Sequence, residues 1–251
     1  MKKFPVAVQP YTIREALAKD YAGALEQVAE IGYQGIELGL PPAGMSIPQQ
    51  KELLDRLGLK VVGTHAGFDT LDFDTDVIAD YLEAVDGGKF VTISLRFESR
   101  EDVLRKAAKM NQIGEKFRQR GLQFLYHNHN WEFVKFDGEY ALDILLRETD
   151  SNLVKTELDT YWIQKGGEDP VAYLSKLKNR APMLHIKDME AGDEQAFAEI
   201  GKGVLDFQAI AQVAEEIGVE WLVVEQDECR VDPFQSLKIS YDNLKKLDLM
   251  A

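Results

Sequence analysis

The sequence predicts one (β/α)8 TIM barrel that spans residues 1–251. Short apolar runs alternate with longer segments of helical periodicity, and this alternation repeats about every thirty residues. Both kinds of segment occur eight times, and no Gly-, Pro- or Ser-rich linker separates them. The first strand leads into Gln9-Pro10-Tyr11-Thr12 rather than a glycine-rich phosphate turn. These observations favour a closed barrel over an open doubly wound sheet.

The apolar runs place the expected strands, and the helical periodicity places the expected helices. We expect strands at 6–9, 35–38, 61–64, 90–95, 123–126, 154–158, 183–186 and 222–224. We expect helices at 21–31, 48–57, 76–85, 100–120, 140–147, 170–176, 207–217 and 233–246. A glycine follows four of these helices, at Gly32, Gly58, Gly121 and Gly218. Because glycine adopts left-handed backbone angles at little cost, it predicts helix ends there.

The composition of the chain argues against several classes of function. A formal net charge of -14 argues against binding to nucleic acid, which depends on basic side chains. The single Cys229 cannot form an internal disulfide, and Lys2, Lys3 and Pro5 interrupt any signal-like apolar stretch. No apolar run approaches the roughly 18 residues of a membrane-spanning helix. We therefore expect a cytoplasmic protein that contacts neither membrane nor nucleic acid.

All four histidines of the chain fall at or just beyond expected strand ends. They are His65, His127, His129 and His185. Carboxylates gather at the same places, namely Glu37, Glu157, Asp159, Asp188 and Glu225. Active sites of TIM barrels lie at the carboxyl ends of the strands. The histidines therefore predict one catalytic site rather than scattered structural roles.

Side-chain alternation predicts which of these groups point into the barrel. In the strand at 154–158, Lys155, Glu157 and Asp159 share one face, which we assign to the interior. In the strand at 183–186, the same alternation points His185 and Lys187 inward. Buried charges are costly unless they are paired, so we expect an internal ion pair between Lys155 and Glu157.

Strands five to eight would bring two imidazoles and two carboxylates together as His127, Asp159, His185 and Glu225. Nitrogen and oxygen ligands without a thiolate suit Mn²⁺, Mg²⁺, Co²⁺, Fe²⁺ or Zn²⁺. We therefore predict one divalent metal ion at this end of the barrel.

Other residues near the strand ends have open alternatives. Lys187 could stabilise an enolate oxygen, form an ion pair with Asp188, or form a Schiff base. Glu37 and His65 could contact substrate hydroxyl groups or pack the barrel.

Three further side chains are predicted near the rim. Trp131 and Trp162 could stack on a sugar or close the site as lids. Arg96 could bind an anionic group or form a surface ion pair with Glu98.

Four segments together carry a family resemblance. They are Leu158-Asp159-Thr160-Tyr161-Trp162, Leu184-His185-Ile186-Lys187-Asp188, Gly201-Lys202-Gly203-Val204-Leu205-Asp206 and Val224-Glu225-Gln226-Asp227. The chain resembles the sugar phosphate isomerase/epimerase group of the xylose isomerase-like (AP endonuclease family 2) barrels over essentially its whole length. The resemblance implies an ion, often Mn²⁺, held by His127, Asp159, His185 and Glu225.

One position departs from that family. Its ketose 3-epimerases use two metal-bound glutamates as proton carriers, and His127 stands where the first would be. Glu225 remains as the implied base, and His129, Glu132 or Glu157 could supply the second proton carrier. Tyr126-His127-Asn128-His129 is also similar to inosose dehydratase-like and 3-keto-glycoside-processing relatives.

We therefore expect a metal-dependent isomerase or epimerase that acts on a sugar or cyclitol through a metal-bound enediolate. A lyase or dehydratase of the inosose or 3-keto-glycoside type is the alternative. An endonuclease IV-like nuclease conflicts with the acidity of the chain, and a non-catalytic subunit would not need a complete ligand set. The expected catalytic residues are Glu225, His129 and Lys187, and a homo-oligomer is compatible with the sequence.

Overall fold

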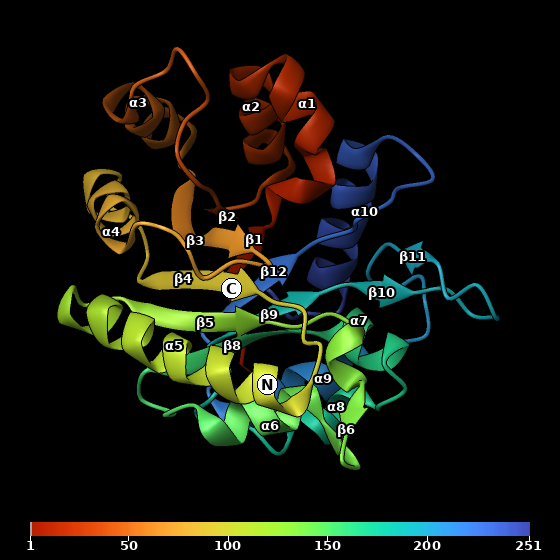
Figure 1. Cartoon of the computed structure of the whole chain (residues 1–251). Coiled ribbons are helices and arrows are strands. Elements are labelled where there is room, and N and C mark those ends of the chain that lie inside the picture. Colours follow the sequence, from red (N-terminus) through yellow and green to blue (C-terminus); the bar gives the residue numbers. More distant parts are fainter. Residues whose placement is uncertain (1) are drawn as a thin grey trace.

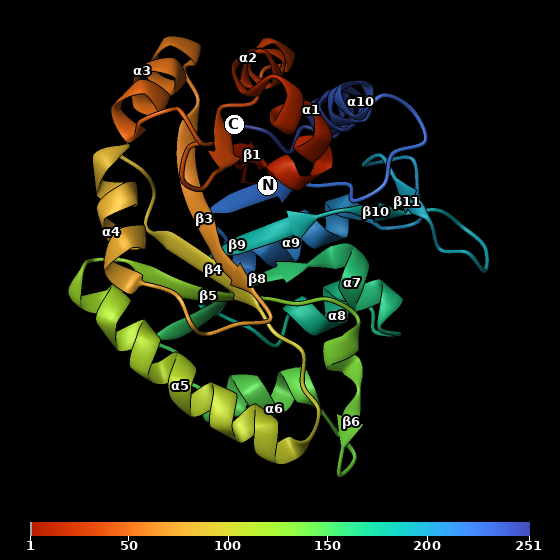
Figure 2. The same cartoon turned by 45° about the horizontal axis from the view of Figure 1, so that its top comes forward.

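The computed structural model describes residues 2–251 and contains a closed barrel of eight parallel strands. The strands run around the barrel in the order β1-β12-β9-β8-β5-β4-β3-β2 (Figures 1 and 2). Their bounds are β1 Val6–Val8, β2 Gly35–Glu37, β3 Lys60–Phe68, β4 Phe90–Ser94, β5 Gln123–His127, β8 Val154–Asp159, β9 Met183–Ile186 and β12 Trp221–Val224. This closed order confirms the predicted TIM barrel.

Helices surround the strands, as expected for alternating βα units (Figure 2). They are α1 Arg14–Lys19, α2 Tyr21–Ile31, α3 Ile47–Leu57, α4 Thr75–Ala84, α5 Arg100–Gln119, α6 Ala141–Glu148, α7 Thr160–Lys165, α8 Pro170–Leu174, α9 Phe207–Ile217 and α10 Pro233–Lys246. Gly32, Gly58 and Gly218 have positive φ angles and end α2, α3 and α9, and Gly121 has a positive φ just beyond α5. All four glycine predictions are therefore confirmed.

Several elements were not expected from the sequence. They are the short helices α1 and α7, the 3-10 turns η1 Pro10–Ile13 and η2 Trp131–Phe133, and two small hairpins. One hairpin pairs β6 Lys135–Phe136 with β7 Glu139–Tyr140, and the other pairs β10 Asp188–Met189 with β11 Phe197–Ala198. These elements are too short to show a periodic apolar pattern. The strand expected at 61–64 continues in β3 to Phe68.

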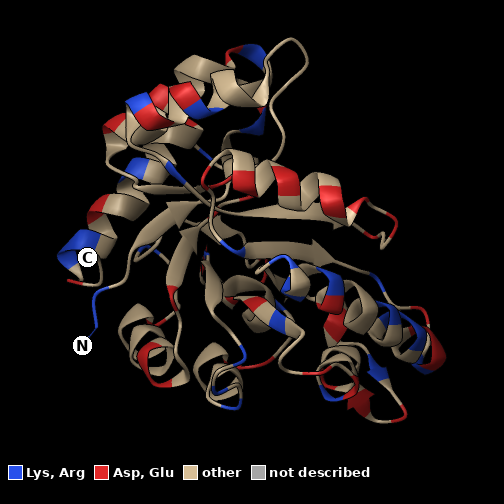
Figure 3. Cartoon of the chain, turned by 90° about the vertical axis from the view of Figure 1, so that its left-hand side faces the viewer, with Lys and Arg blue, Asp and Glu red and all other residues tan. Residues whose placement is uncertain are grey.

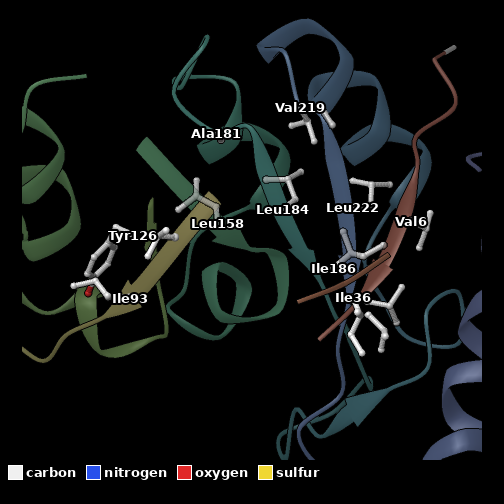
Figure 4. Close-up of a cluster of buried hydrophobic side chains, with 14 of the residues drawn as sticks. Val6, Ile36, Ile93, Tyr126, Leu158, Ala181, Leu184, Ile186, Val219 and Leu222 are labelled. Atoms are coloured by element: carbon white, nitrogen blue, oxygen red, sulfur yellow. The ribbon is translucent and has the colours of Figure 1, made fainter. Parts of the chain in front are cut away.

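The main hydrophobic core lies between the barrel and its helices. Outward-facing strand residues such as Val6, Ile36 and Leu184 fill it (Figure 4). Charged side chains lie mostly on the surrounding helices, while the strands carry few of them (Figure 3). The side chains on the inward-facing side of the strands form a separate interior inside the barrel.

The inside of the barrel has an apolar layer below a polar one. A separate cluster of Ala7, Val62, Phe90, Leu125, Met183 and Val223 fills the amino-terminal end. Two residues further along their strands, Leu125 is followed by His127, Met183 by His185 and Val223 by Glu225. Side chains alternate along a strand, so these polar residues point inward one layer higher. This polar layer positions the candidate site.

Within residues 2–251, no helix is both long enough and apolar enough to cross a membrane.

Candidate metal centre and active site

The four histidines lie together at the carboxyl ends of the strands, as the sequence predicted. The ring centroid of His127 is 4.4 Å from that of His185, 5.0 Å from that of His129 and 5.6 Å from that of His65. They come from β3, β5, β9 and the loop after β5. Residues that are up to 120 positions apart in sequence therefore form one cluster.

The structure brings the predicted ligand set together. His127, Asp159, His185 and Glu225 each offer one ligand atom, and these atoms lie within 4.8 Å of one another. All four side chains are buried. We call this set the upper ligand group.

Local hydrogen bonds orient the members of the upper ligand group. Nδ1 of His127 lies 3.2 Å from the carbonyl oxygen of Glu157 and must donate to it, which leaves Nε2 as the free nitrogen. Asp159 caps α7, because its Oδ1 accepts from the backbone N–H of Trp162 at 3.0 Å. Its backbone N–H donates to Oδ1 of Asn128 at 3.0 Å. The fold therefore holds both side chains in place before any ion binds.

The donor set fits a divalent cation. Oδ2 of Asp159 is buried and accepts no hydrogen bond from residues 2–251, although Nζ of Lys187 lies 3.1 Å away. A buried carboxylate oxygen without a hydrogen bond is costly unless a cation or a proton satisfies it. Two imidazole nitrogens and two carboxylate oxygens leave coordination positions for a substrate.

A second set of titratable groups lies against the first and shares His185 with it. Glu37, His65 and Glu157 place ligand atoms around Nε2 of His185, which is 2.7 Å from Oε2 of Glu37 and 3.2 Å from Oε1 of Glu157. Nδ1 of the same ring faces Oε2 of Glu225 at 2.9 Å. The two nitrogens of His185 therefore face different residues. Nε2 faces Glu37 and Glu157, and Nδ1 faces Glu225 of the upper ligand group.

The predicted ion pair between Lys155 and Glu157 is wrong. Glu157 contacts His65 and His185 instead, with oxygen-to-nitrogen distances of 3.3 and 3.2 Å. Lys155 and Glu157 do share a strand face, but residues two apart on a strand are separated by about 6.6 Å. Lys155 also lies half-buried nearer the amino-terminal end of β8.

Burial and neighbouring charges set the proton affinities in the cluster. Burial lowers the pKa of His65, but the carboxylates of Glu37 and Glu157 outweigh it and raise the pKa to about 9. For His129, burial and the nearby Lys187 ammonium lower the pKa to about 3. His65 is therefore cationic at neutral pH and His129 is neutral.

Lys187 lies in a cage of carboxylates. Its Nζ is 2.6 Å from Asp227, 2.7 Å from Glu225 and 3.1 Å from Asp159. Burial opposes its charge, but these carboxylates raise the pKa of Lys187 well above its ordinary value. A Schiff base requires a neutral amine, so this cage argues against that alternative.

The alternative of an ion pair between Lys187 and Asp188 is wrong. Asp188 points to the other side of the strand, where its carboxylate accepts backbone hydrogen bonds from Met189, Gly201, Gly203 and Leu205 at 2.8 to 3.1 Å. A Cβ atom at Gly203 would collide with Asp188 and with the carbonyl of Met189. The glycine-containing stretch singled out in the sequence therefore wraps around a buried carboxylate.

His129 belongs to an aromatic stack at the side of the site. Its ring lies parallel to that of Trp131, with centroids 3.9 Å apart and planes 12° apart. The guanidinium of Arg96 lies 4.1 Å from the centroid of Trp131. His129 and Arg96 therefore both pack against Trp131. The guanidinium of Arg96 lies against the Trp131 and Phe68 rings, and no ion pair joins it to Glu98 among the described residues, so that alternative is wrong.

The remaining predicted residues divide between the cavity and the barrel interior. A cavity of about 660 Å³ opens over the upper ligand group and is lined by His65, Trp131 and Trp162 among others. Glu37 is 2 % exposed and contacts Gln9 and His185, so it packs the barrel rather than facing the cavity. Trp162 packs edge-on against Tyr161 and lies under the ammonium of Lys187.

Sequence reasoning missed several cavity residues. Asp227 follows Glu225 at the spacing that returns to one strand face, and this spacing was the available signal. Gln9 and Tyr11 follow β1, and Phe68 ends β3. Phe68 was missed because the strand was expected to end four residues earlier.

Comparison with known proteins agrees with this geometry. A family model described as a xylose isomerase-like TIM barrel matches residues 25–247. The chain belongs to this family. The xylose isomerase-like assignment covers most of the barrel and includes every member of the upper ligand group.

Individual relatives of this xylose isomerase-like chain include dehydratases and isomerases. It is 25% identical to the inosose dehydratase of Lacticaseibacillus casei over 257 aligned positions, which cover 84% of each protein. A sugar phosphate isomerase/epimerase from Parabacteroides distasonis has a similar structure, with a TM-score of 0.84, 22% identity and coverage of 100% and 96% of the two chains. The structure of the IOLI protein, which has a bound zinc atom, matches with a TM-score of 0.73, 16% identity and 98% coverage of both chains.

Proposed function

We propose that this protein is a divalent-metal-dependent lyase that removes water, or another β-substituent, from a keto sugar or keto cyclitol through an enediolate. The observation that carries the proposal is the upper ligand group, whose Glu225, His127 and His185 line the cavity. The cationic His65 and the neutral His129 line the same cavity. The dehydratase relative aligned over 84% of the chain supports elimination rather than isomerisation.

His127, Asp159, His185 and Glu225 would hold the ion. We propose Mn²⁺, because nitrogen and oxygen donors without sulfur accept it, and the zinc in the IOLI structure shows that a similar barrel holds a transition metal. When bound, the ion supplies Lewis-acid polarisation of the substrate carbonyl.

The chain's own groups would carry the protons. Glu225 faces the cavity as an ionised carboxylate, because Lys187 and His185 outweigh burial and lower its pKa. It is placed to take the proton next to the ketone. His65 is held cationic by Glu37 and Glu157 and can donate a proton to the departing oxygen.

His129 and Lys187 complete the proposed machinery. Among the described residues, the buried Nδ1 of His129 has no hydrogen-bond partner, and the ring is neutral, so it can accept a hydrogen bond from a substrate. Lys187 balances the charge of Asp159, Glu225 and Asp227. Burial raises the pKa of Asp159 to about 6 and also raises the pKa of Asp227, and the Lys187 ammonium opposes both shifts.

An isomerase or epimerase is the second reading. Such an enzyme returns the proton to a carbon of the same molecule instead of expelling a group. The two-glutamate form of this reaction needs a second carboxylate where His127 lies, and His129 would have to replace it as the second proton carrier.

The test uses the purified protein loaded with Mn²⁺, an inosose as substrate, and D₂O as solvent. We expect ultraviolet absorption from the unsaturated product, and deuterium at the carbon beside the ketone in recovered substrate when proton removal is reversible. Glu225→Gln should lower the rate by about 10²- to 10⁴-fold, the usual range for losing a general base. Cys229→Ser is the control, because Cys229 lies outside the cavity. Deuterium exchange with an epimer as product would favour the second reading, and the absence of both exchange and product formation would reject both.

A further inference from the structure

The cavity has two chemically different parts. Its floor is polar and includes His127, His185, Lys187 and Glu225. Its entrance includes two aromatic rings that are largely open to solvent, Tyr11 at 50% and Phe68 at 56% exposure. The two rings reach the entrance from the turn after β1 and from the end of β3.

These two rings differ from the other aromatic residues that line the cavity. Trp131 packs closely against His129 and Arg96, and Trp162 packs against Tyr161 and Phe197. Phe68 meets the rings of His129 and Trp131 edge to face, with ring centroids 5.8 and 6.0 Å apart. Burying a phenyl ring is worth about 1.5–3 kcal/mol, so an exposed ring at a cavity entrance is available to a ligand.

Flat cationic groups lie beside both exposed rings. The guanidinium of Arg14 lies 4.2 Å from the ring of Tyr11, and that of Arg96 lies 5.9 Å from the ring of Phe68. Guanidinium groups stack on aromatic planes, so Arg14 packs against the ring of Tyr11, which is still 50% exposed. The entrance therefore suits a planar group.

The cavity is also larger than one sugar ring requires. A six-carbon ring with its oxygens has about 12 non-hydrogen atoms, and at a water molecule's share of roughly 30 Å³ each they fill at most about 360 Å³. The cavity measures about 660 Å³. The remaining space is at least the size of a second small ring.

We infer that the entrance binds an aromatic substituent attached to the ring on the polar floor, so that the natural ligand is an aryl-substituted sugar or cyclitol. This inference rests on the proposed function only for the identity of the ring on the floor. Tyr11 and Phe68 contact the substituent, with Arg14 and Arg96 beside them.

The test compares two ligands that share one ring. Binding of phenyl β-D-glucoside and methyl β-D-glucoside to the Mn²⁺-loaded protein is measured by calorimetry. The wild-type protein should bind the phenyl compound at least about tenfold more tightly, which corresponds to about 1.4 kcal/mol. Phe68→Ala and Tyr11→Ala should each reduce this ratio to about threefold or less. Val77→Ala, an exposed apolar position on α4, should leave the ratio unchanged.

Equal affinity for the two glucosides in the wild-type protein would overturn the inference, as would no measurable binding of the phenyl compound. A ratio that Phe68→Ala and Tyr11→Ala leave unchanged would also overturn it. The inosose reaction in D₂O contains no aryl group and tests the proposed function separately. If the inosose reacts but the protein shows no aryl preference, only the inference is rejected. If the protein shows aryl preference but the inosose neither reacts nor exchanges, only the proposed function is rejected.

Discussion

Nε2 of His185 lies 2.7 Å from Oε2 of Glu37, while Nδ1 of the same ring faces Glu225. A carboxylate behind a ligating imidazole fixes the ring's orientation and tautomer and increases its basicity. Glu37 therefore acts on the upper ligand group through His185, without facing the cavity itself.

Replacing this carboxylate should weaken the metal site. We expect Glu37→Gln to lower the affinity for Mn²⁺ by about 10- to 100-fold, as found for other residues behind metal ligands. Calorimetric titration of the metal-free protein measures this. Glu26→Gln, on the outer surface of α2, is the matched control. An affinity equal to that of the wild type would show that Glu37 serves only to pack the barrel.

Trp131 should act as a positioning residue for His129. Because the ring of His129 stacks on that of Trp131, we expect Trp131→Leu to misplace His129 and lower kcat by about 10- to 100-fold with little change in KM. Trp131→Phe keeps an aromatic face and should restore most of kcat. If KM rises while kcat is unchanged, Trp131 contacts the substrate directly, as the sequence first suggested.

Asp188 should be important for stability rather than for metal binding. Its carboxylate accepts four backbone hydrogen bonds, and a hydrogen bond to a charged group contributes roughly 1.5–3 kcal/mol. Since such contributions are not additive, we expect Asp188→Ala to lower the free energy of unfolding by roughly 3–5 kcal/mol. Urea denaturation measures the change, with the exposed Asp193→Ala as control. A loss below about 1 kcal/mol would contradict this role.

Glu132 should make stability depend on pH. Burial raises its pKa from 4.5 to about 8, although the hydroxyl of Tyr126 and the backbone N–H of His129 oppose the shift. The folded state therefore holds a proton that the unfolded state releases, and this stabilisation is full below about pH 4.5. It is lost as the pH rises through about 8.

The comparison of wild type with Glu132→Gln isolates this effect. Between those pH values the free energy of unfolding of the wild type should fall relative to the variant by up to about 1.4 kcal/mol per pH unit. Urea titrations of both proteins at several pH values measure the difference. A constant difference would mean that Glu132 is ionised in the folded protein.

The barrel was predictable because its signals are local and repeated. The glycine after a helix and the apolar run of the next strand each mark one boundary, and Gly32, Gly58 and Gly218 lie where they were expected. By contrast, α7 is six residues long and begins at Thr160, directly after Asp159, and the sequence pattern showed only the strand end there. Elements shorter than two turns carry too little periodicity to be recognised.

The composition of the site was also predictable, but its pairing was not. Alternation along β8 and β9 placed Glu157, Asp159, His185 and Lys187 inside the barrel, where they lie. Which carboxylate meets which cation depends on the tilt and stagger of neighbouring strands. Lys155 consequently has a different environment from the one expected, and Asp188 turns away from Lys187.

The polar interior of the barrel contains more carboxylates than ammonium groups among the described residues. Asp159, Glu225 and Asp227 surround the ammonium of Lys187, while Glu37 and Glu157 contact the imidazoles of His65 and His185. Without an ion, His65 and His185 are protonated, because the surrounding carboxylates raise their pKa values by more than burial lowers them. Loading a dication should therefore expel protons into the solvent, so the ion's apparent affinity should rise with pH. At a fixed concentration of the ion, the fraction of protein that holds it would then depend on the pH.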